Sequence, residues 1–410
     1  MLRLDGAASI EEYERFCRGH LPDPYPLFQR LQAEDPVHWS DLLGAWVITR
    51  YSGVVAGLRD PRLSSERVPV FMGSLPQPLR SQVHPLGEHL SRWVSQVNPP
   101  DHTRLRRLIS IAFTPKTVEK VRPRIQEVVD GLIDKVKQDG QMDLIEQFAY
   151  PLPATVISEM LGVPSRGQDR FRRWSDDIMA FVGVSVLALP AIAEKCYQSL
   201  SELTAYFETI IQECRSNPRE DLISALVAAE EQGDRLSAEE LISMCSQLLV
   251  AGHETTTQLI ANGILTLLRH PSELEKLKQD PSLIAPAIEE IMRFEGPSQR
   301  QTRLVVEDVE MGGKRIPKGA TVLLMLGAAN RDSAEFPSPD QFDICRSPNR
   351  HVGFSSGIHF CVGAPLARLE GAMAINTLLR RLPNLRLAAE DFEWRENMSL
   401  RGLKSLPVRF

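Results

Sequence analysis

Apolar residues recur at helical spacing along much of the chain. The longest such run extends from Ala238 to Arg269, a second covers residues 284–294, and a third, from Leu366 to Arg380, keeps its apolar residues on one face. A period of 3.6 residues over these lengths is typical of helices that bury a face in a core. The pattern therefore predicts a protein that is mainly helical.

The remaining pattern adds further helices and little sheet. Helical spacing continues from residue 101 to about 216, with interruptions near Gly183 and Pro190. Strand-like text is confined to a predicted hairpin at residues 36–50 and a segment at 318–326.

Residues 62–97 contain scattered prolines and glycines with few apolar positions, so a loop-rich segment is expected there. The fold class is predicted to be mainly α with small β-sheets.

Length and composition favour a single folded unit. The 410 residues are 43% hydrophobic and 24% charged, and they show no internal repeat or low-complexity linker. We expect one domain that spans residues 1–410.

The net charge of −6 argues against nucleic acid or an anionic membrane as a partner. The longest apolar run, Val182 to Ala193, is too short to cross a bilayer, and the N-terminus does not resemble a signal peptide. The six cysteines form no CxxC pair, so a reducing, cytoplasmic location is expected.

One cysteine lies in a distinctive segment, Phe354-Ser-Ser-Gly357-Ile-His359-Phe-Cys361-Val-Gly363. Glycines 357 and 363 are expected to take backbone angles that other residues avoid, which lets the chain wrap around the sulfur. A helix that starts directly after the cysteine would lower the pKa of its thiol. This segment alone leaves three interpretations open: a buried structural cysteine, a zinc ligand paired with His359, or an axial ligand of haem iron. Zinc is disfavoured because the chain offers no companion pair of ligands at the right spacing.

The long apolar helix carries a polar group in its middle, Ala251-Gly252-His-Glu254-Thr255-Thr. Glutamate is rarely buried without a partner, and threonine hydroxyls can bond back to the helix and bend it. With Gly252 opening room, the segment predicts a kinked helix whose cavity is lined by an acid and an alcohol that can relay protons. The alternative is a packing glycine beside exposed polar residues.

Two further groups of charges gain meaning only in combination. Glu290 and Arg293 share a helix face, and Arg346 downstream could bring a second arginine to the same carboxylate. His102 and Arg106 also share a helix face. Together with Arg303 and His359, they would suit the two carboxylates of a haem. Each residue alone is typical of a protein surface.

In combination these segments resemble the cytochrome P450 family, specifically its soluble bacterial members. The segment around Cys361 is similar to the haem-binding signature, residues 251–256 to the oxygen-activating part of the central helix, and residues 98–106 to the helix that contacts the haem carboxylates. The resemblance keeps this order from about Asp23 to the C-terminus. One departure is Ser355, where the family usually has glycine.

The resemblance implies the P450 fold, a triangular helical prism in which haem b lies between the long central helix and the cysteine loop. Cys361 would be the axial thiolate, a ligand that favours cleavage of a bound O–O bond. Thr255 would donate a hydrogen bond to the oxygen being activated and Glu254 would supply protons, within the catalytic segment that includes Ala251 and Gly252. The cofactor-binding residues implied are His102, Arg106, Arg303, Phe354, Gly357, His359, Cys361 and Gly363. Glu290, Arg293 and Arg346 would form a buried ion network, and His351 is assigned a structural role.

The implied activity is a monooxygenase that hydroxylates or epoxidises an apolar small molecule with O2, such as a secondary metabolite, terpenoid, steroid or fatty acid. Two alternatives are a peroxide-using peroxygenase and a non-catalytic haem-binding or docking protein. The intact Glu254–Thr255 pair argues against both. No zinc is expected.

The resemblance also implies partners. The chain has no clustered cysteines for an iron–sulfur domain, so electrons are expected from a ferredoxin or flavodoxin with an NAD(P)H-dependent reductase, and the enzyme is expected to be a monomer. A basic patch that would attract an acidic donor is predicted from Arg104, Arg107, Lys116, Arg350 and Arg368. The substrate pocket would be lined from residues 64–97, 170–195, 245–256, 297–303 and 399–403. Its candidate apolar walls are Phe71, Met72, Trp174, Met179, Phe181, Leu249 and Leu400, with Arg300 as a possible partner for a carboxylate.

Overall fold

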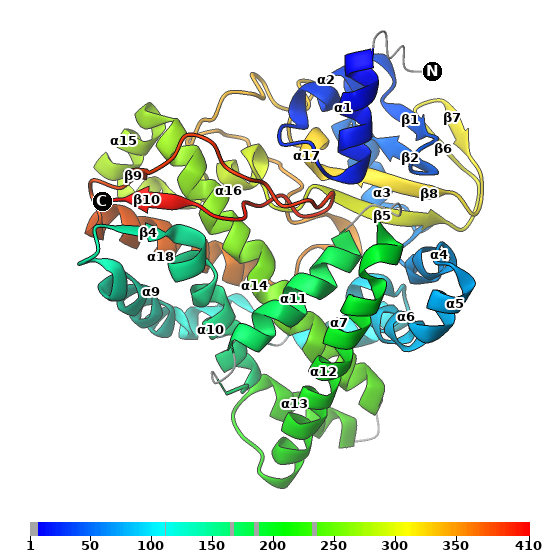
Figure 1. The fold of residues 1–410 in the computed structure, drawn as a ribbon, viewed down its shortest axis with the longest axis horizontal. Helices are drawn as coiled ribbons and strands as arrows, with labels where there is room; N and C mark the ends of the chain where they lie inside the picture. Colours follow the sequence, from blue (N-terminus) through cyan, green and yellow to red (C-terminus); the bar gives the residue numbers. More distant parts are fainter. Residues whose placement is uncertain (1–6, 111, 165–167, 184–187, 232–235) are drawn as a thin grey trace.

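The computed structural model describes residues 7–110, 112–164, 168–183, 188–231 and 236–410. The outline is roughly triangular (Figure 1), with helices over most of its area and the largest sheet in one corner beside α1 (Ala7–Arg18) and α2 (Tyr25–Glu34). The expected fold class, mainly α with small sheets, is confirmed.

The long helix α14 (Ala238–Arg269) runs through the centre of the molecule, with the bounds expected from its apolar pattern. It begins in a capping box, in which the Ser237 hydroxyl accepts a hydrogen bond from the Glu240 amide and the Glu240 carboxylate accepts one from the Ser237 amide. Three helices already expected or implied by the pattern contact it: α12 (Leu189–Ser216), α16 (Ile284–Phe294) and α18 (Ala364–Arg381).

The helical stretch from residue 101 to 216 is confirmed as a series of separate helices. The described part of α11 extends to Gly183 and α12 begins at Leu189, so most of the interruption expected near Gly183 and Pro190 lies outside the described residues. The series comprises α7 (Asp101–Ser110), α8 (Pro115–Lys120), α9 (Arg122–Val136), α10 (Pro151–Leu161), α11 (Gln168–Gly183) and α12.

The prediction of a loop-rich segment at residues 62–97 is wrong. Three short helices occupy it: α4 (Val68–Gly73), α5 (Gln77–Gln82) and α6 (His84–Ser91). Each has a proline in its first turn, where the missing N–H group would have no helical partner in any case. The prolines that suggested loops are helix starts.

The largest sheet has five strands in the order β1-β2-β8-β5-β3. Its members are β1 (Val37–Ser40), β2 (Ala45–Ile48), β3 (Leu63–Ser64), β5 (Arg300–Val305) and β8 (Thr321–Met325). The expected hairpin is β1–β2, and β8 lies within the expected strand at 318–326. The parallel pairing of β2 with β8 joins segments far apart in the chain, which a local pattern cannot predict.

Smaller elements complete the fold. A three-stranded sheet contains β4 (Gln141–Asp143), β10 (Pro407–Arg409) and β9 (Arg386–Leu387), and β6 (Val309–Met311) pairs with β7 (Lys314–Ile316). The other helical segments are α3 (Tyr51–Arg59), α13 (Leu222–Glu231), α15 (Pro271–Gln279), α17 (Leu326–Ala329), η1 (Val94–Gln96), η2 (Ile145–Ala149), η3 (Pro281–Leu283) and η4 (Gly357–His359).

The main hydrophobic core surrounds α14, and two smaller cores cover the two faces of the five-stranded sheet. Leu323 and Met325 of β8 belong to the core beneath α1 and α2, whereas Val322 and Leu324 belong to the core beside α3. Because cross-strand partners share a face, Arg300 opposite Met325 points toward α1, and Arg303 opposite Val322 points toward α3.

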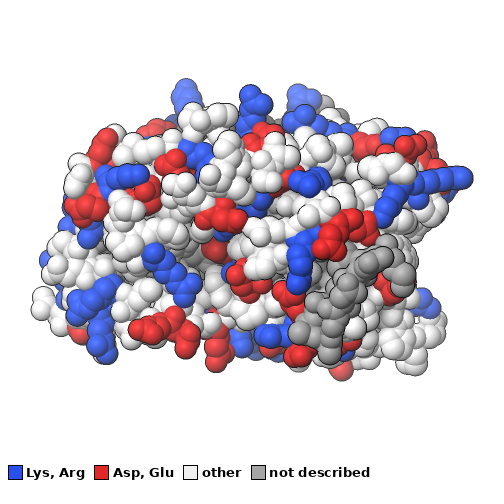
Figure 2. All heavy atoms as spheres, turned by 90° about the horizontal axis from the view of Figure 1, so that it is seen from above, with Lys and Arg blue, Asp and Glu red and all other residues white. Residues whose placement is uncertain are grey.

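One face of the molecule carries charges of both signs (Figure 2). On the face seen from above, blue and red side chains alternate across the atoms drawn in colour (Figure 2). Within the residues that the structure describes, no helix has the length and apolar character needed to cross a membrane.

Candidate active site: a cysteine loop facing an acid–alcohol helix

The loop around Cys361 closes through its own backbone. The Cys361 amide donates a hydrogen bond to the Phe354 carbonyl at 3.0 Å, which fixes both ends of the turn. Gly357 has φ of +72°, and a Cβ there would lie 2.9 Å from the Leu58 carbonyl oxygen of α3. Both the backbone angle and the close approach require glycine at this position.

Gly363 differs from the expectation for it. Its φ is −80°, an angle open to any residue, so the prediction of an unusual backbone conformation was wrong here. Gly363 stands directly before α18, and a Cβ on it would lie 3.8 Å from the Cys361 sulfur. The glycine therefore leaves space beside the sulfur while its amide faces the thiol.

The environment of the Cys361 thiol contains opposing influences. Part of the residue is exposed, yet the protein around the sulfur raises the pKa of the thiol by desolvation. The amides of Gly363 and Ala364 and the guanidinium of Arg106 oppose that rise. Amides aimed at a sulfur stabilise its thiolate and tune a metal bound to it.

Ser355, the departure from the family pattern, occupies strained backbone. Its φ is +64°, in the left-handed region that favours glycine, and its amide bonds to the Val352 carbonyl at 2.8 Å. The glycine usual at this position would adopt the same angle without strain.

Four of the predicted cofactor residues converge beside the loop with a fifth that sequence reasoning missed. The His102 and His359 rings lie 4.4 Å apart, and His359 Nε2 lies 2.9 Å from the Ser65 hydroxyl. Arg106 donates to the Phe360 carbonyl at 2.6 Å. We name the group His102, Arg106, Arg303, His359 and the additional Arg67 the basic cluster.

The basic cluster lacks anions of its own. Among the described residues, none of its arginines pairs with a carboxylate, and Arg67 Nη1 and His102 Nε2 have no hydrogen-bond partner although they are buried. Burial lowers the pKa of Arg303 to about 10 and that of Arg67 to about 9, where Arg303 and Arg300 add repulsion. Burial also lowers the pKa of His359 to about 3, with Arg303 and His102 contributing.

Buried cations without partners are costly, so the cluster fits a ligand that brings negative charge. A haem brings two carboxylates, and guanidinium groups bind carboxylates through charged, often bidentate, hydrogen bonds. The thiol of Cys361 next to the cluster supplies the one strong protein ligand that haem iron needs. The residues present fit a haem.

The acid–alcohol pair lies in the middle of α14. Glu254 is almost completely buried, with its carboxylate 3.3 Å from Arg395 Nη1 and 3.5 Å from His253 Nε2. Burial raises the pKa of Glu254, but His253 and Arg395 outweigh it and hold the pKa below its usual value. The Thr255 hydroxyl lies 3.4 Å from the Ala251 carbonyl, a weak bond that leaves the hydroxyl able to donate elsewhere.

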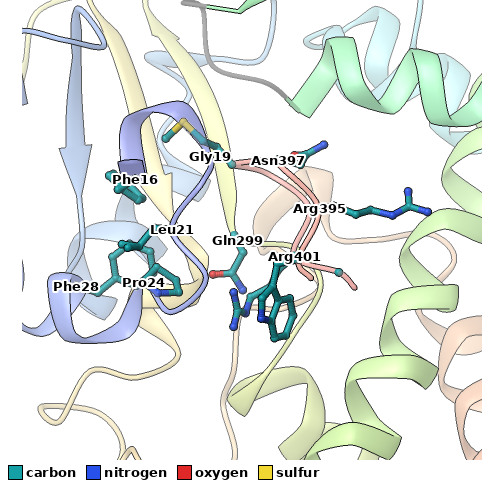
Figure 3. A pocket seen from close by; sticks show the side chains of 12 residues that line it. Phe16, Gly19, Leu21, Pro24, Phe28, Gln299, Arg395, Asn397 and Arg401 are labelled. Atoms are coloured by element: carbon teal, nitrogen blue, oxygen red, sulfur yellow. The ribbon is translucent and has the colours of Figure 1, made fainter. Parts of the chain in front are cut away.

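Charged groups connect Glu254 with the surface. Arg395 extends from the C-terminal segment toward α14 (Figure 3) and also donates to Asp176 at 2.9 Å. Asp176 lies 3.9 Å from Arg172, which pairs with the exposed Glu146. The chain of ion pairs gives the buried acid a polar route to solvent.

Gly252 serves close helix packing. A Cβ there would meet the Ile157 side chain of α10 at 2.6 Å, so the glycine lets the two helices approach. This matches the packing alternative for Gly252, whereas the neighbouring Glu254 is buried rather than exposed. The carbonyl of the exposed Ala251 accepts the Thr255 bond.

The structure brings Glu290, Arg293 and Arg346 together as one buried network. Arg293 donates twice to Glu290 at 2.8 Å, and Arg346 Nε donates to the same carboxylate at 3.2 Å. The Asn349 side chain and the Asp343 amide add bonds at 3.0 Å. Arg293 is also bound by the carbonyls of Asn330, Pro339 and Gln341. Both guanidinium groups share the Glu290 carboxylate, and backbone carbonyls accept further hydrogen bonds from them.

His351 lies beside that network rather than at a ligand site. Its Nε2 lies 3.0 Å from Glu289, which also accepts two hydrogen bonds from Arg368. The Arg368 guanidinium lies 4.5 Å from the centre of the Phe354 ring. Glu289, His351 and Arg368 therefore pack against the cysteine loop and stabilise it.

Two residues singled out from the sequence have partners within the chain. Trp174, a candidate wall of the substrate pocket, packs against Phe171 and Tyr206 between α11 and α12 and donates to Glu202 at 2.8 Å. Arg104, expected in a basic patch, pairs with Asp101 and Glu240.

Sequence reasoning missed Arg67, Arg395 and Asp176. Arg67 and Arg395 lie outside the periodic segments, and only the tertiary fold brings them to the site. No local pattern marks Arg67, because its burial appears only in the fold.

Comparisons with known proteins agree with this geometry. The family model described as "Cytochrome P450" matches residues 78–388. The chain is 43% identical to the cytochrome P450 monooxygenase PikC of Streptomyces venezuelae, over 95% of this chain and 91% of that protein. It is 40% identical to the vitamin D(3) 25-hydroxylase of Pseudonocardia autotrophica, over 97% of this chain and 96% of that protein.

Among solved structures, a myxobacterial cytochrome P450 in complex with myristic acid superposes with a TM-score of 0.88 and 43% identity. The superposition covers 97% of this chain and 98% of the other. The family model and the similarity to these relatives show that the chain belongs to the cytochrome P450 family and is a haem-dependent monooxygenase of that family.

Proposed function

We propose that this enzyme hydroxylates or epoxidises an apolar small molecule with O2, using electrons delivered by a separate protein. The observation that carries the proposal is a cysteine loop beside a basic cluster that has no carboxylate partner among the described residues, combined with an intact acid–alcohol pair on the central helix. We further propose that residues 1–410 act as one domain, as a monomer in the cytoplasm.

In this proposal haem b would be held by the Cys361 thiolate, and its carboxylates would be bound by His102, Arg106, Arg303 and His359. When bound, the haem supplies the oxidation chemistry. Phe354, Gly357 and Gly363 shape the loop: the Phe354 carbonyl fixes the Cys361 amide, and the glycines permit the turn and the space beside the sulfur. The network of Glu290, Arg293 and Arg346 holds the segment before the loop.

Glu254 and Thr255 manage protons. Glu254 is held ionised between His253 and Arg395, so it can accept a proton from water that reaches the site. Thr255 can pass a proton to a ligand because its own bond to Ala251 is long. Proton transfer by such positioned groups typically contributes a factor of about 10²–10⁴ to a rate.

The electron donor is proposed to be a ferredoxin or flavodoxin with an NAD(P)H-dependent reductase. Arg107, Lys116 and Arg350 are exposed and available for an acidic partner. Arg104 and Arg368 already pair with carboxylates of this chain, so they contribute less. The Phe360 side chain next to Cys361 is also exposed and offers an apolar contact at that face.

The substrate is proposed to be a secondary metabolite, terpenoid, steroid or fatty acid. Relatives include a vitamin D(3) 25-hydroxylase and a polyketide-biosynthesis cytochrome P450, and one solved relative is a complex with myristic acid. Met72, Phe181, Leu249 and Leu400 remain apolar wall candidates, since all four are buried in the described structure.

The test is oxygen incorporation by the purified enzyme with NAD(P)H and a ferredoxin–reductase pair under ¹⁸O2. One labelled oxygen atom in the product is expected. Thr255→Ala is expected to keep NAD(P)H consumption while diverting it to hydrogen peroxide, and Thr266→Ala, further along α14, serves as the control. Product formed equally well from peroxide alone would favour a peroxygenase, and unchanged coupling in Thr255→Ala would remove the proton role of that residue.

A further inference from the structure

Two buried polar atoms without hydrogen-bond partners face each other in the middle of α14. The His253 side chain is completely buried, and the Glu254 side chain is nearly so. His253 Nε2 lies 3.5 Å from Glu254 Oε1, and neither atom has a hydrogen-bond partner among the described residues. A buried polar atom without a partner costs free energy, so this contact needs a physical explanation.

The other nitrogen of the His253 ring shows where its hydrogen lies. His253 Nδ1 lies 2.7 Å from the Leu249 carbonyl oxygen, which can only accept a hydrogen bond. Nδ1 therefore carries a hydrogen, and a neutral ring then has a bare lone pair on Nε2. That lone pair would face a carboxylate oxygen, and two acceptors repel each other. One further proton between Nε2 and Glu254 Oε1 turns the repulsion into a charged hydrogen bond.

The charges around the pair favour placing this proton on the ring. Arg395 Nη1 lies 3.3 Å from the second oxygen of Glu254, so a cation already faces the carboxylate on that side. Burial raises the pKa of Glu254, but His253 and Arg395 outweigh burial and hold this pKa below its usual value. The carboxylate therefore stays ionised, and the proton belongs on His253.

Other elements enclose the pair with charged and titratable groups. From α11, Asp176 shares Arg395 with Glu254, and Arg172 adds positive charge near that carboxylate. The Tyr150 ring packs edge-on against the His253 ring, with 5.4 Å between the ring centres. None of these described groups replaces Glu254 as the polar group that faces Nε2 of the ring. A proton on Nε2 therefore enters and leaves through Glu254.

We propose that His253 holds a proton in reserve for Glu254, as an imidazolium whose Nε2–H group faces the Glu254 carboxylate. The inference deepens the proposed function and rests on it, because it adds a positioning residue to the proton supply of the same site. On transfer, the N–H bond of His253 breaks, its electron pair stays on Nε2, and an O–H bond forms on Glu254. Glu254 then releases the proton into the site beside Thr255. Water that reaches the site restores the reserve through Glu254 between turnovers.

His270, directly after α14, provides a matched comparison. Its Nδ1 lies 2.8 Å from the Thr266 carbonyl oxygen, which is the same bond to a carbonyl four residues earlier. Its ring contacts Phe294 and Phe342, and no described carboxylate pairs with it. A ring in this setting needs no second proton, so His270 is expected to carry one.

The direct test counts the protons on the His253 ring by NMR. The holoenzyme is labelled with ¹⁵N-histidine, and its ferrous carbon-monoxide form is measured at about pH 8, where an ordinary histidine is neutral. Two protonated ring nitrogens are expected for His253 and one for His270. In Glu254→Gln, the new amide can donate to Nε2, so His253 is expected to carry a single proton. His253→Gln and His270→Gln assign the two resonances by their absence.

A second readout follows the reducing equivalents. Myristic acid, abietic acid and testosterone represent the proposed fatty acid, terpenoid and steroid classes, and the probe that gives the most product is used. His253→Gln keeps an N–H donor near Glu254 but has no proton to transfer. Product formed per NAD(P)H should fall at least about tenfold, within the factor of about 10²–10⁴ that positioned proton donors contribute. Hydrogen peroxide should rise in step, while probe binding, followed by the spin-state change, stays unchanged.

His270→Gln is the control for the lost backbone bond and should keep the wild-type ratio of product to NAD(P)H. Equal losses of product in His253→Gln and His270→Gln would assign His253 a structural role only and overturn the inference. So would wild-type coupling in His253→Gln, a single protonated nitrogen on His253 in the wild type, or two protonated nitrogens that persist in Glu254→Gln. The NMR comparison of wild type with Glu254→Gln decides the question even if His253→Gln fails to fold.

The carbon-monoxide difference spectrum of the same reduced preparation keeps the two failures apart. A missing thiolate-type band would refute the proposed function. An intact band together with a singly protonated His253 would refute only the proton reserve.

Discussion

Two groups of buried arginines in this molecule differ in one respect, the presence of an internal carboxylate. In the Glu290 network, Arg293 and Arg346 share a carboxylate that is itself completely buried. Backbone carbonyls accept the other hydrogen bonds of the Arg293 guanidinium. In the basic cluster, Arg67 and Arg303 are as deeply buried, and no described carboxylate faces them.

The difference separates a structural site from a binding site. A network whose charged groups all have hydrogen-bond partners within the chain needs nothing from outside, and it fixes the segments that it joins. A cluster of desolvated cations without anions is unfavourable until a ligand supplies the charge. Burial of an arginine therefore says little by itself, and the presence or absence of a partner indicates its role.

The largest effect is expected from breaking the compensated group. Glu290→Gln keeps the shape of the side chain but leaves Arg293 without its anion, so the free energy of unfolding should fall by about 3–5 kcal/mol. Urea unfolding followed by circular dichroism measures this loss. Glu310→Gln, on an exposed position of β6, is the matched control and should lie within about 0.5 kcal/mol of wild type. Equal stability of the two variants would refute the structural role of the network.

A smaller and different effect is expected from the basic cluster. Arg303→Met removes a charged partner of a haem carboxylate, which is worth about 1.5–3 kcal/mol. Haem transfer to apomyoglobin should therefore accelerate by about 10–100-fold, while Arg331→Met, at a buried arginine that pairs with Asp340 away from the cluster, should not accelerate it. A normal transfer rate in Arg303→Met would mean that the cluster does not hold the haem.

Glu370 of α18 offers a third case, a completely buried carboxyl without hydrogen-bond partners among the described residues. Burial raises its pKa well above the ordinary value, so the native protein keeps a proton that the unfolded chain releases. The free energy of unfolding should fall by about 1.4 kcal/mol per pH unit as pH rises above the ordinary pKa of Glu, until the native pKa is reached.

Glutamine does not ionise, so the free energy of unfolding of Glu370→Gln should lack this fall with rising pH. The difference in stability between the variant and wild type should be constant below about pH 4 and should grow in favour of the variant at higher pH. Urea unfolding from pH 4 to 8 measures the difference, and parallel curves over the whole range would show that Glu370 is not held protonated.

The smallest effect is expected at Ser355. Glycine adopts φ of +64° without the strain that an L-residue bears there, a gain partly offset by the greater freedom of glycine in the unfolded chain. Ser355→Gly should therefore raise the free energy of unfolding by up to about 1 kcal/mol without changing the haem spectrum. Ser356→Gly, next to it with φ of −153°, should lower stability slightly instead. A loss of stability in Ser355→Gly would show that the serine side chain compensates the strain.

Local pattern predicted the helices well and the irregular segments poorly. The bounds of α14 and α16 follow from apolar spacing because those helices are long and bury a continuous face. The helices α4 to α6 were missed because each is short and has a proline in its first turn, and prolines in a polar segment suggest a loop. The parallel pairing of β2 with β8 depends on contacts between distant segments and has no local signal.

The site divides in the same way. Residues within contiguous motifs, such as Cys361 and Thr255, are recognisable in the sequence because their neighbours set their geometry. Arg67 and Arg395 reach the site from irregular segments, and only the fold shows that Arg67 belongs to the basic cluster and that Arg395 pairs with Glu254. Gly363 shows a different limit. The motif correctly places this glycine directly before α18, but the backbone angle expected for it was wrong.

The central claim is that Cys361 binds haem iron as a thiolate, and the carbon-monoxide difference spectrum of the reduced enzyme tests it most directly. The account predicts the red-shifted Soret band typical of a thiolate-ligated haem in the wild type, and its loss in Cys361→Ser. Cys345→Ser, at an exposed cysteine outside the loop, should leave the band unchanged. A wild-type spectrum without the shifted band, or a band that survives in Cys361→Ser, would contradict the account.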